Sequence, residues 1–309
     1  MSDWQLSVPV AFIIFNRPDV TEKVFAEIAK AKPPKLLIIG DGSRNTRPGE
    51  HDLVLATRKI IEKIDWECNV LTNFSDANLG CKNRVSSGLD WVFEQVEEVI
   101  ILEDDCLPDP TFFRFCEEML HLYKFDQRVA QITGVNFQFG HRHNDDSYYF
   151  SKYAHIWGWA TWRDRWQENY DVNMDKWPQF KEQHGLKELF NNFTEEKYWG
   201  YVFDLVHRKG IDTWDYQWFF SCFLNGQLTV VPQVSLITNI GFGADATHTT
   251  EQSLLAHIEK GTMEFPPKHP LGIHQNRALD DRHFDTIFSP SISRRFKEKL
   301  YKLKTKILN

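Results

Sequence analysis

The sequence lacks long apolar runs and patterned cysteines. A membrane-spanning helix needs about 20 consecutive apolar residues, and no stretch of this sequence approaches that length. The first residues also lack the basic and apolar segments of a secretory signal peptide. The five cysteines include no C-x-x-C pair, which disfavours a disulfide framework or a zinc site and favours reduced, buried thiols. We therefore expect a cytoplasmic protein.

Two common nucleotide-binding motifs are absent as well. No G-x-G-x-x-G sequence follows the first apolar run, where Asn16-Arg17-Pro18 stands instead, and no G-x-x-x-x-G-K-[ST] sequence occurs. These absences argue against a Rossmann dinucleotide site and against a P-loop. The formal net charge of −7 argues against a protein that coats nucleic acid, so we expect no nucleic-acid partner.

The composition is that of a folded protein rich in aromatic residues. Among 309 residues, 42% are hydrophobic and 26% are charged, which is ordinary for a globular chain. Aromatic residues reach 14%, and eleven of them are tryptophan. Such residues can build a thick core, but they also form flat walls for sugar or nucleobase rings.

Strands and helices are expected to alternate over the first hundred residues. Short apolar runs predict buried strands, and segments of helical spacing between them predict helices. The predicted strands are Val8–Phe15, Leu36–Gly40, Asn69–Phe74 and Val99–Leu102, and the predicted helices are Asp19–Lys30, Leu53–Ile64 and Arg84–Val96. This alternation predicts an α/β fold with a parallel sheet and helices on both faces.

Polar residues at the ends of these strands form the first candidate site. In such sheets, ligands bind outside the carboxyl ends of the strands. The residues at these ends are Asn16, Arg17, Asp41 and the triplet Glu103-Asp104-Asp105. Three adjacent carboxylates repel one another and need a positive partner, and Mg²⁺ or Mn²⁺ suits them together with substrate phosphates. A solvated acidic turn is the alternative.

The second half of the chain contains most of the tryptophan. We expect a helix from Asp109 to about Lys124, a strand at Val129–Phe137, helices at Glu195–Lys209 and Asp215–Asn225, and a strand-like segment at Gln227–Ile240. A tryptophan-dense stretch lies at His155–Trp166. Its indole rings suit either core packing or an acceptor platform, because sugar C–H groups pack well on indole.

Several segments, in order along the chain, resemble a known family. Val99–Phe113, with Glu-Asp-Asp at a strand end and paired phenylalanines in the following helix, resembles the motif of the Golgi N-acetylglucosaminyltransferase that begins complex N-glycans. Trp214–Trp218 resembles that family's Trp-Asp-Asp-Trp segment, and Pro232–Gly243 followed by His248 resembles its Pro-Glu-Ile-Ser…Phe-Gly stretch. Pro9–Arg17 and the Asp41-Gly42 turn resemble family-two and related GT-A glycosyltransferases.

The resemblance implies an α/β/α sandwich of the GT-A type, with a mostly parallel central sheet, and an inverting sugar transfer. The donor would be a nucleotide-diphosphate sugar, and the cofactor Mn²⁺ or Mg²⁺. Asp105 would bind the metal, Asp104 would face the donor's ribose or sugar, and Glu103 would touch the sugar hydroxyls. The residues that the resemblance places around the nucleotide are Asn16, Arg17, Asp41 and Arg84.

The indole rings suggest an acceptor site, and the resemblance adds a further metal ligand and a general base. The candidate acceptor residues are Trp157, Trp159 and Trp214. His248 is a candidate metal or phosphate ligand, with a plain loop histidine as the alternative. Asp215 is the candidate base, because an inverting transfer must deprotonate the acceptor hydroxyl; a helix N-cap is the alternative. Tyr216 replaces the family's second Asp and Asn16 replaces its first-strand Asp, which leaves the acceptor and the donor base open.

The last residues differ in charge from the rest of the chain. Residues 291–309 contain seven Lys or Arg and one Glu, a charge of +6, so the preceding part carries −13. Phe296, Leu300, Leu303 and Ile307 share one face of a predicted helix. This basic amphipathic helix suits either an anionic membrane surface, which would make the protein peripheral at the inner face of the membrane, or packing on the domain. We thus expect a catalytic domain at 1–290, with a nucleotide-sugar half (about 1–137) and an acceptor half (about 138–290).

These observations predict a metal-dependent glycosyltransferase that acts on a hydroxyl of a glycan or lipid-linked acceptor. A nucleotidyltransferase of sugar phosphates shares the sheet and the acidic metal site. It normally carries a glycine-rich loop after the first strand, which Ile13–Val20 lacks. A non-catalytic carbohydrate-binding protein is the third interpretation, and metal-dependent binding of a nucleoside diphosphate separates it from both enzymes.

Overall fold

A central eight-stranded sheet organises the protein. The computed structural model describes residues 4–190, 192–242, 255 and 258–289. The strands of the sheet are β1 (Val10–Ile14), β2 (Lys35–Gly40), β3 (Asn69–Phe74), β4 (Glu98–Glu103), β6 (Val129–Thr133), β7 (Tyr148–Ser151), β8 (Trp159–Trp162) and β9 (Leu228–Pro232). Their spatial order is β3-β2-β1-β4-β8-β6-β9-β7.

Most of these strands run in one direction. β3, β2, β1 and β4 pair in parallel, as do β6 and β9. β8 is antiparallel to both β4 and β6, and β7 is antiparallel to β9, so six of the eight strands share one direction. The predicted fold class, an α/β sandwich with a mostly parallel central sheet, is confirmed by this arrangement, and the GT-A type stays what the resemblance implies.

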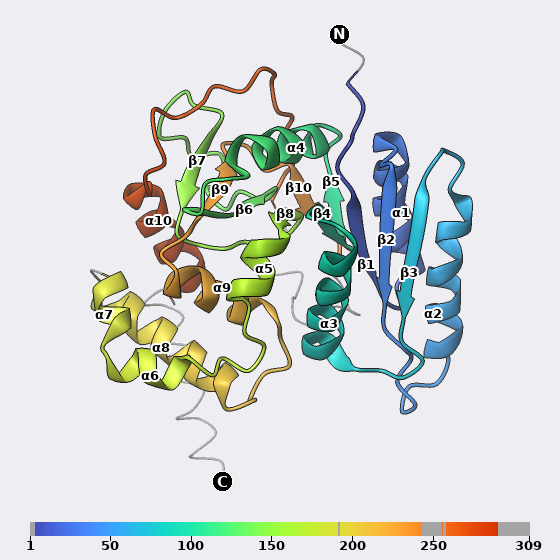
Figure 1. Cartoon of the computed structure of the whole chain (residues 1–309), viewed down its shortest axis with the longest axis horizontal. Coiled ribbons are helices and arrows are strands. Elements are labelled where there is room, and N and C mark those ends of the chain that lie inside the picture. The colour runs from blue at the N-terminus through green and yellow to red at the C-terminus, as the bar shows by residue number, and fades with distance from the viewer. Residues whose placement is uncertain (1–3, 191, 243–254, 256–257, 290–309) are drawn as a thin grey trace, which may run out of the picture.

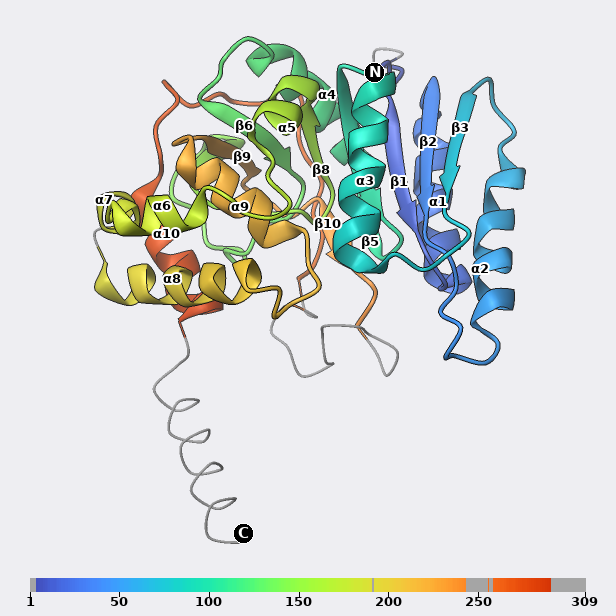
Figure 2. The same ribbon diagram turned by 60° about the horizontal axis from the view of Figure 1, so that its bottom comes forward.

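Helices cover both faces of the sheet, as Figures 1 and 2 show. Side chains of α1 (Pro18–Ala31) and α4 (Thr111–Tyr123) belong to one hydrophobic cluster, and those of α3 (Gly80–Gln95), α5 (Arg163–Asn169), α8 (Phe193–His207) and α9 (Asp215–Leu224) belong to a second. At the β3 end lie α2 (Glu50–Lys59) and the short helix η1 (Ile60–Lys63), while α6 (Trp177–Glu182) and α7 (Gly185–Leu189) lie at the opposite end. The last described helices are α10 (Arg277–His283) and η3 (Phe284–Phe288).

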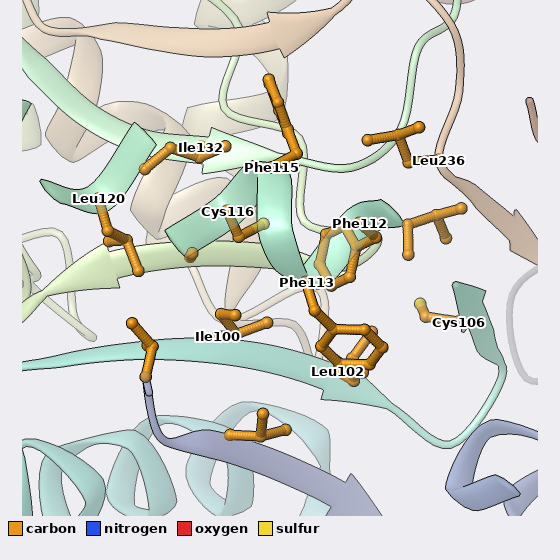
Figure 3. Close-up of a cluster of buried hydrophobic side chains, with 14 of the residues drawn as sticks. Ile100, Leu102, Cys106, Phe112, Phe113, Phe115, Cys116, Leu120, Ile132 and Leu236 are labelled. Atoms are coloured by element: carbon orange, nitrogen blue, oxygen red, sulfur yellow. The ribbon is translucent and has the colours of Figure 1, made fainter. Parts of the chain in front are cut away.

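The alternation of side chains along the strands explains the two clusters. Successive strand residues point to opposite faces of a sheet. In β4, Ile100 and Leu102 join the α1–α4 cluster, whereas Val99 and Ile101 join the α3–α9 cluster. Figure 3 shows the first of these, with phenylalanines of α4 lying over Ile100 and Leu102. All these residues are fully buried, and each such side chain contributes about 1.5–3 kcal/mol of hydrophobic stabilisation.

The largest departures from the predicted elements are in the second half. The predicted strand segment Gln227–Ile240 is two strands, because the chain leaves the main sheet after Pro232 and forms β10 (Ile237–Asn239), which pairs antiparallel with β5 (Cys106–Pro108). The tryptophan-dense stretch contains β8, a central strand, and the start of α5. The predicted helix at residues 53–64 starts earlier, at Glu50, and ends in η1.

Some predictions lie beyond what the structure describes. His248 and the basic segment 291–309 fall outside the described residues, so their predicted roles stay predictions, as does the division into two halves. Within the described ranges, no helix has the length and hydrophobicity to cross a membrane.

Candidate functional site

The strand order places the candidate site at a topological switch point. From β1 the chain moves outward to β2 and β3, and it then returns to place β4 on the other side of β1. Ligands of open α/β sheets bind at such a reversal, outside the carboxyl ends of the strands. β1 and β4 are in register there, with Ile13 opposite Glu103. Arg17 follows β1 and the acidic triplet ends β4, so the two candidate segments meet at this edge.

Arg17 neutralises two of the three carboxylates. Its Nη2 donates hydrogen bonds to Asp104 Oδ1 and, at 2.9 Å, to Asp105 Oδ2. The backbone N–H of Phe15 donates to Asp104 Oδ2 at 3.3 Å. Asp104 is buried, and the side chains of Arg17 and Asp105 are 27% and 16% exposed. The positive partner that the triplet required is therefore supplied, in this structure, by the residue at the end of β1.

Two opposing effects set the pKa values of Asp104 and Arg17: burial favours the neutral form of each group, and the ion pairs between them favour the charged form. Burial raises the pKa of Asp104 to about 6, although Arg17 acts to lower it. For Arg17, burial alone would lower the pKa, but the charges of Asp104 and Asp105 more than compensate and raise it. Arg17 is consequently a fixed positive charge at the switch point.

Glu103 occupies a different environment from its two neighbours. It follows Val99 and Ile101 in the strand alternation, which directs its side chain to the face covered by α3 and α9. Burial, and then the charges of Asp105, Asp104 and Asp215, raise the pKa of Glu103 well above its usual range. Its Oε1 atom is buried and has no hydrogen-bond partner within the described part of the chain. Glu103 therefore keeps one buried oxygen that lacks a hydrogen-bond partner in the described structure, on the face covered by α3 and α9.

Asp215 comes to the same place from a distant part of the sequence. It is the first residue of α9, and its Oδ1 accepts a hydrogen bond from the Thr213 hydroxyl. Its charge contributes to the raised pKa of Glu103, which places the two carboxyl groups within electrostatic range of each other. The structure thus places Asp215 within electrostatic range of Glu103, and its role as the base stays a prediction.

The carboxylates at the end of β4 are ligands of the kind that a divalent cation prefers, but in the described part of the chain they do not form a complete cation site. Asp105 Oδ1 is contacted by the weakly polar thiol of Cys106 at 3.6 Å, while Asp105 Oδ2 is taken by Arg17. One or two carboxylates plus substrate phosphates are the usual ligands of Mg²⁺ and related cations. Among the described residues no group of three or more His, Cys, Asp or Glu side chains is arranged to hold a metal ion by itself. The assignment of Asp105 to a cation, with phosphate oxygens as further ligands, therefore stays a prediction.

The strand β10 brings a glycine against this centre. The backbone N–H of Ile240 donates to the backbone oxygen of Asp105 at 2.8 Å. A Cβ atom at Gly241 would overlap Asp105 Oδ2 and lie 2.7 Å from Arg17 Nη1. Only glycine allows so close an approach. Sequence analysis did not single out Gly241, although a glycine directly after a strand is a signal of such an approach.

Three predicted nucleotide-binding residues are held in local hydrogen bonds around the site. Asp41 is buried and accepts hydrogen bonds from the backbone N–H groups of Gly42, Leu79 and Gly80 at 2.9–3.1 Å. Arg84 Nη2 donates to the backbone and side-chain oxygens of Asn73, at 2.9 and 2.6 Å.

Asn16 likewise has a partner outside the triplet. Its Nδ2 donates to Glu50 Oε1 at 2.9 Å, and Glu50 is also bound by Arg44. Arg44 lies over the Phe15 ring at 5.3 Å. Sequence analysis missed Arg44, in the loop before α2, and Glu50, the first residue of α2, because the two are six residues apart and carry no motif. Direct contact of Asn16, Asp41 and Arg84 with a nucleotide remains a prediction.

The three predicted acceptor tryptophans do not share one environment. Trp159 and Trp214 are 0% and 2% exposed and stack on each other, with ring centroids 5.7 Å apart. Burial in the core leaves neither ring a free face for an acceptor, which corrects the expectation of an exposed platform. Trp157 is only partly buried and packs edge-on against Phe242, next to Gly241. Of the three, Trp157 is the one placed beside the site.

Comparisons with known proteins give similarities of fold. No protein-family model and no curated protein sequence matches this chain. Among solved structures, a mannosyltransferase from Pyrobaculum calidifontis in complex with GDP-Man and Mn²⁺ is 14% identical, covers 55% of this chain and 49% of its own, and has a TM-score of 0.40. A cytidylyltransferase from Leptospira borgpetersenii serovar Hardjo-bovis is 11% identical over 53% and 63% of the two chains, with a TM-score of 0.31.

A third solved structure is the inositol-1-phosphate CTP transferase from T. maritima. It is 11% identical, over 48% of this chain and 56% of that one, with a TM-score of 0.25. The matched part spans between 49% and 63% of the length of these three proteins, which are all transferases.

Proposed function

We propose that this chain is a metal-dependent, inverting glycosyltransferase that uses a nucleotide-diphosphate sugar. The observation that carries the proposal is the meeting of three elements at the switch point of the sheet. They are the triplet at the end of β4, the Arg17 cation at the end of β1, and Asp215 at the start of α9. Sugar transfer from a nucleotide donor needs charge stabilisation at a diphosphate and a carboxylate beside the acceptor hydroxyl, and this edge offers both.

The diphosphate is assigned to Asp105 and Arg17. When bound, Mn²⁺ or Mg²⁺ supplies positive charge to the leaving diphosphate, and Asp105 is the residue that would hold it. Arg17 adds a charge that stays fixed at every physiological pH. A guanidinium also presents several N–H donors, so Arg17 can bind a phosphate oxygen while it remains paired with Asp104.

Asp215 is assigned the role of general base. The acceptor oxygen attacks the anomeric carbon, the bond from that carbon to the diphosphate oxygen breaks, and the electron pair leaves with the nucleoside diphosphate. The acceptor's proton passes to Asp215. The N-terminus of α9 favours the ionised form of this carboxylate, which the base must have before the reaction.

Glu103 and Trp157 are assigned to the sugars. The Oε1 atom of Glu103 is buried without a partner among the described residues, so it can accept a hydrogen bond from a hydroxyl group of a donor sugar. Trp157 offers a partly exposed ring beside Gly241, where an acceptor glycan or lipid-linked sugar would approach. A membrane role of the basic C-terminal segment remains a separate prediction.

Calorimetry tests the nucleotide and metal assignment. The wild-type protein is titrated with UDP, GDP and CDP in the presence of Mn²⁺ or of EDTA, and Asp105→Ala is titrated with the tightest of the three. We expect Mn²⁺-dependent binding in the wild type and its loss in Asp105→Ala, with an unchanged circular dichroism spectrum. Asp126→Ala is the matched control, because Asp126 also pairs with an arginine, Arg128 at 2.7 Å, but far from the site. Undiminished Mn²⁺-dependent affinity in Asp105→Ala would refute the metal assignment.

Product analysis separates the glycosyltransferase from the nucleotidyltransferase. A glycosyltransferase releases a nucleoside diphosphate from a nucleotide sugar, whereas a nucleotidyltransferase releases pyrophosphate from a nucleoside triphosphate and a sugar phosphate. The turn Phe15–Pro18 contains no glycine, whereas a nucleotidyltransferase normally carries a glycine-rich loop after the first strand, and this favours the first reaction. A thermal-shift panel of nucleotide sugars with and without Mn²⁺ selects the donor, since a ligand at 100 times its Kd adds about 2.7 kcal/mol.

A further inference from the structure

The N-terminus of α3 is capped by two carboxylates that come from other parts of the chain. Its own N-cap residue, Leu79, makes no side-chain cap hydrogen bond. The first N–H groups of a helix have no partner within the helix and need one from elsewhere. Asp41, at the end of β2, accepts from the backbone N–H groups of Leu79 at 2.9 Å and Gly80 at 3.1 Å.

Asp212 caps the next two N–H groups. Its Oδ2 accepts from Cys81 N at 3.1 Å and its Oδ1 accepts from Lys82 N at 2.9 Å. Asp212 lies 130 residues further along the chain than Lys82, in the connection between α8 and α9. The two aspartates together therefore satisfy all four free N–H groups at the start of α3, and Asp212 joins the acceptor half to the donor half.

The contact between Asp212 and α3 is close enough to require glycine. Gly80 has a φ of +78°, a conformation that L side chains rarely adopt. A Cβ atom at this position would lie 2.7 Å from Asp212 Oδ2. Gly80 is thus required twice, once by its backbone conformation and once by the approach of Asp212.

The segment that follows Asp212 is held on its other side as well. The Tyr170 hydroxyl donates to the Trp214 backbone oxygen at 3.1 Å, and Gln217 Nε2 donates to the Thr213 backbone oxygen at 2.6 Å. Trp214 is buried against Trp159. Asp215 comes next in this segment, three residues after Asp212, so its position depends on the contacts at both ends.

The start of α3 lies among the carboxylates of the site. Although Cys81 as a residue is exposed, desolvation of its thiol, and then the charges of Glu103, Asp215, Asp212 and Asp41, raise the pKa of that thiol above its usual range. Asp41 and Asp212 thus contact the first turn of α3, and the charges of Glu103 and Asp215 act on it as well. A helix N-terminus carries a partial positive charge, which stabilises nearby carboxylates. The first turn of α3 therefore stabilises the negative charge of the acidic residues next to it.

We propose that Asp212 is a positioning residue, which clamps the α8–α9 connection to the N-terminus of α3 and thereby sets the place of Asp215 beside Glu103. The proposal rests on the proposed transferase function for its catalytic consequence, but the clamp itself is a property of the fold. Asp212 is not assigned the role of base, because both of its oxygens already accept backbone hydrogen bonds. Loss of the clamp would leave the donor site intact and displace the base.

The first test follows the thiol of Cys81 and needs no activity. In a Cys68→Ser background, Cys81 is the remaining cysteine that is not buried. Its alkylation by iodoacetamide at pH 8 is measured by mass spectrometry, alone and with Asp212→Ala. Removal of a neighbouring carboxylate and of the cap should raise the alkylation rate several-fold. Equal rates with and without Asp212→Ala would refute the clamp.

The second test separates positioning from a purely structural role. The kcat and the donor KM are measured with the nucleotide sugar selected by the thermal-shift panel. We expect Asp212→Ala to lower kcat by on the order of 10- to 100-fold, as small misplacements of reacting groups do, with the donor KM within about twofold. Asp212→Asn keeps one carbonyl acceptor for the helix N-terminus and should recover part of the loss.

The matched control is Asn192→Ala. Asn192 caps α8 through the Thr194 backbone N–H at 2.9 Å, an exposed cap of similar kind outside the site. Its loss should leave kcat unchanged. If Asp212→Ala lowers kcat no more than Asn192→Ala does, the positioning role is refuted. If the wild type has no transferase activity but the Cys81 rates differ as expected, the proposed function fails and the clamp stands.

Discussion

The carboxyl edge of β1 and β4 and the aromatic layer beneath α8 and α9 differ in what they leave accessible. Both are rich in residue types that contact nucleotides or sugars. At the strand edge, Arg17 and Asp105 keep 27% and 16% of their side chains exposed. In the aromatic layer, six tryptophans are at most 2% exposed, namely Trp159, Trp166, Trp177, Trp199, Trp214 and Trp218.

This difference shows that position relative to a strand end is a better guide to a site than residue type. The strand edge exposes backbone and polar side chains because the sheet ends there, whatever covers its faces. Tryptophan on a helix or a central strand is instead drawn into the core, since burying its large apolar surface stabilises the fold. The predictions below test this contrast between an exposed edge and a buried aromatic layer.

The largest effect is expected at the point where the two regions meet. Asp215→Asn keeps the size of the side chain but removes the base, so turnover should fall by about 10²–10⁴-fold, the usual contribution of general base catalysis. Donor affinity should hold, because the residues proposed to bind the diphosphate, Arg17 and Asp105, follow the ends of β1 and β4. Steady-state kinetics and calorimetry with the same nucleotide sugar measure both quantities. Near-normal turnover in a folded Asp215→Asn protein would refute the base assignment; the alternative of a helix N-cap is wrong, because in the described structure Trp214 holds that position and makes no side-chain cap hydrogen bond.

A pair of tryptophan variants sharpens the contrast directly. Trp159→Ala should lower the free energy of unfolding by about 3–5 kcal/mol, because it removes a buried ring that packs on Trp214, Trp166 and Trp218. Trp157→Ala should cost much less stability and should raise the acceptor KM instead. Urea unfolding measures the free energy of unfolding of both variants, and steady-state kinetics measures their acceptor KM. Equal losses of stability in both variants would contradict the assignment of Trp157 to the site.

The smallest expected effect concerns acid stability in the aromatic layer. Burial lowers the pKa of His155 to about 3, and burial together with His155 lowers that of His283 well below its usual value. An unfolded histidine has a pKa of about 6.5, so the unfolded chain takes up more protons between these values. The free energy of unfolding is therefore not reduced by these histidines above pH 6.5. Below that value it decreases as the pH falls toward 3, by about 1.4 kcal/mol per pH unit for each histidine.

Urea unfolding at pH 7.5 and 5.5 measures this dependence. His155→Phe should lose less stability than the wild type between the two values, since phenylalanine does not titrate and His155 already packs against Phe137 with centroids 4.6 Å apart. His143→Gln, at an exposed loop position, is the control and should behave as the wild type does. An identical pH dependence in His155→Phe would show that His155 is not the source of acid sensitivity.

The local pattern of the sequence determined much of the fold and the centre of the site. Periodicity predicted the alternation from β1 to β4, because buried strands and amphipathic helices are visible over a few neighbouring residues. The same alternation placed Arg17 and the Glu103–Asp105 triplet at one edge of the sheet, where the structure finds them paired. These relationships follow from the fixed geometry of parallel strands and require no knowledge of distant contacts.

Only the tertiary structure decided which residues from distant parts of the sequence lie in contact. No local pattern shows that Asp212 caps α3, that Gly241 lies against Asp105, or that Trp159 lies in a central strand rather than at a surface. Each of these depends on packing between segments far apart in sequence, and the free energy of that packing comes from the whole core and not from the few residues that form the contact.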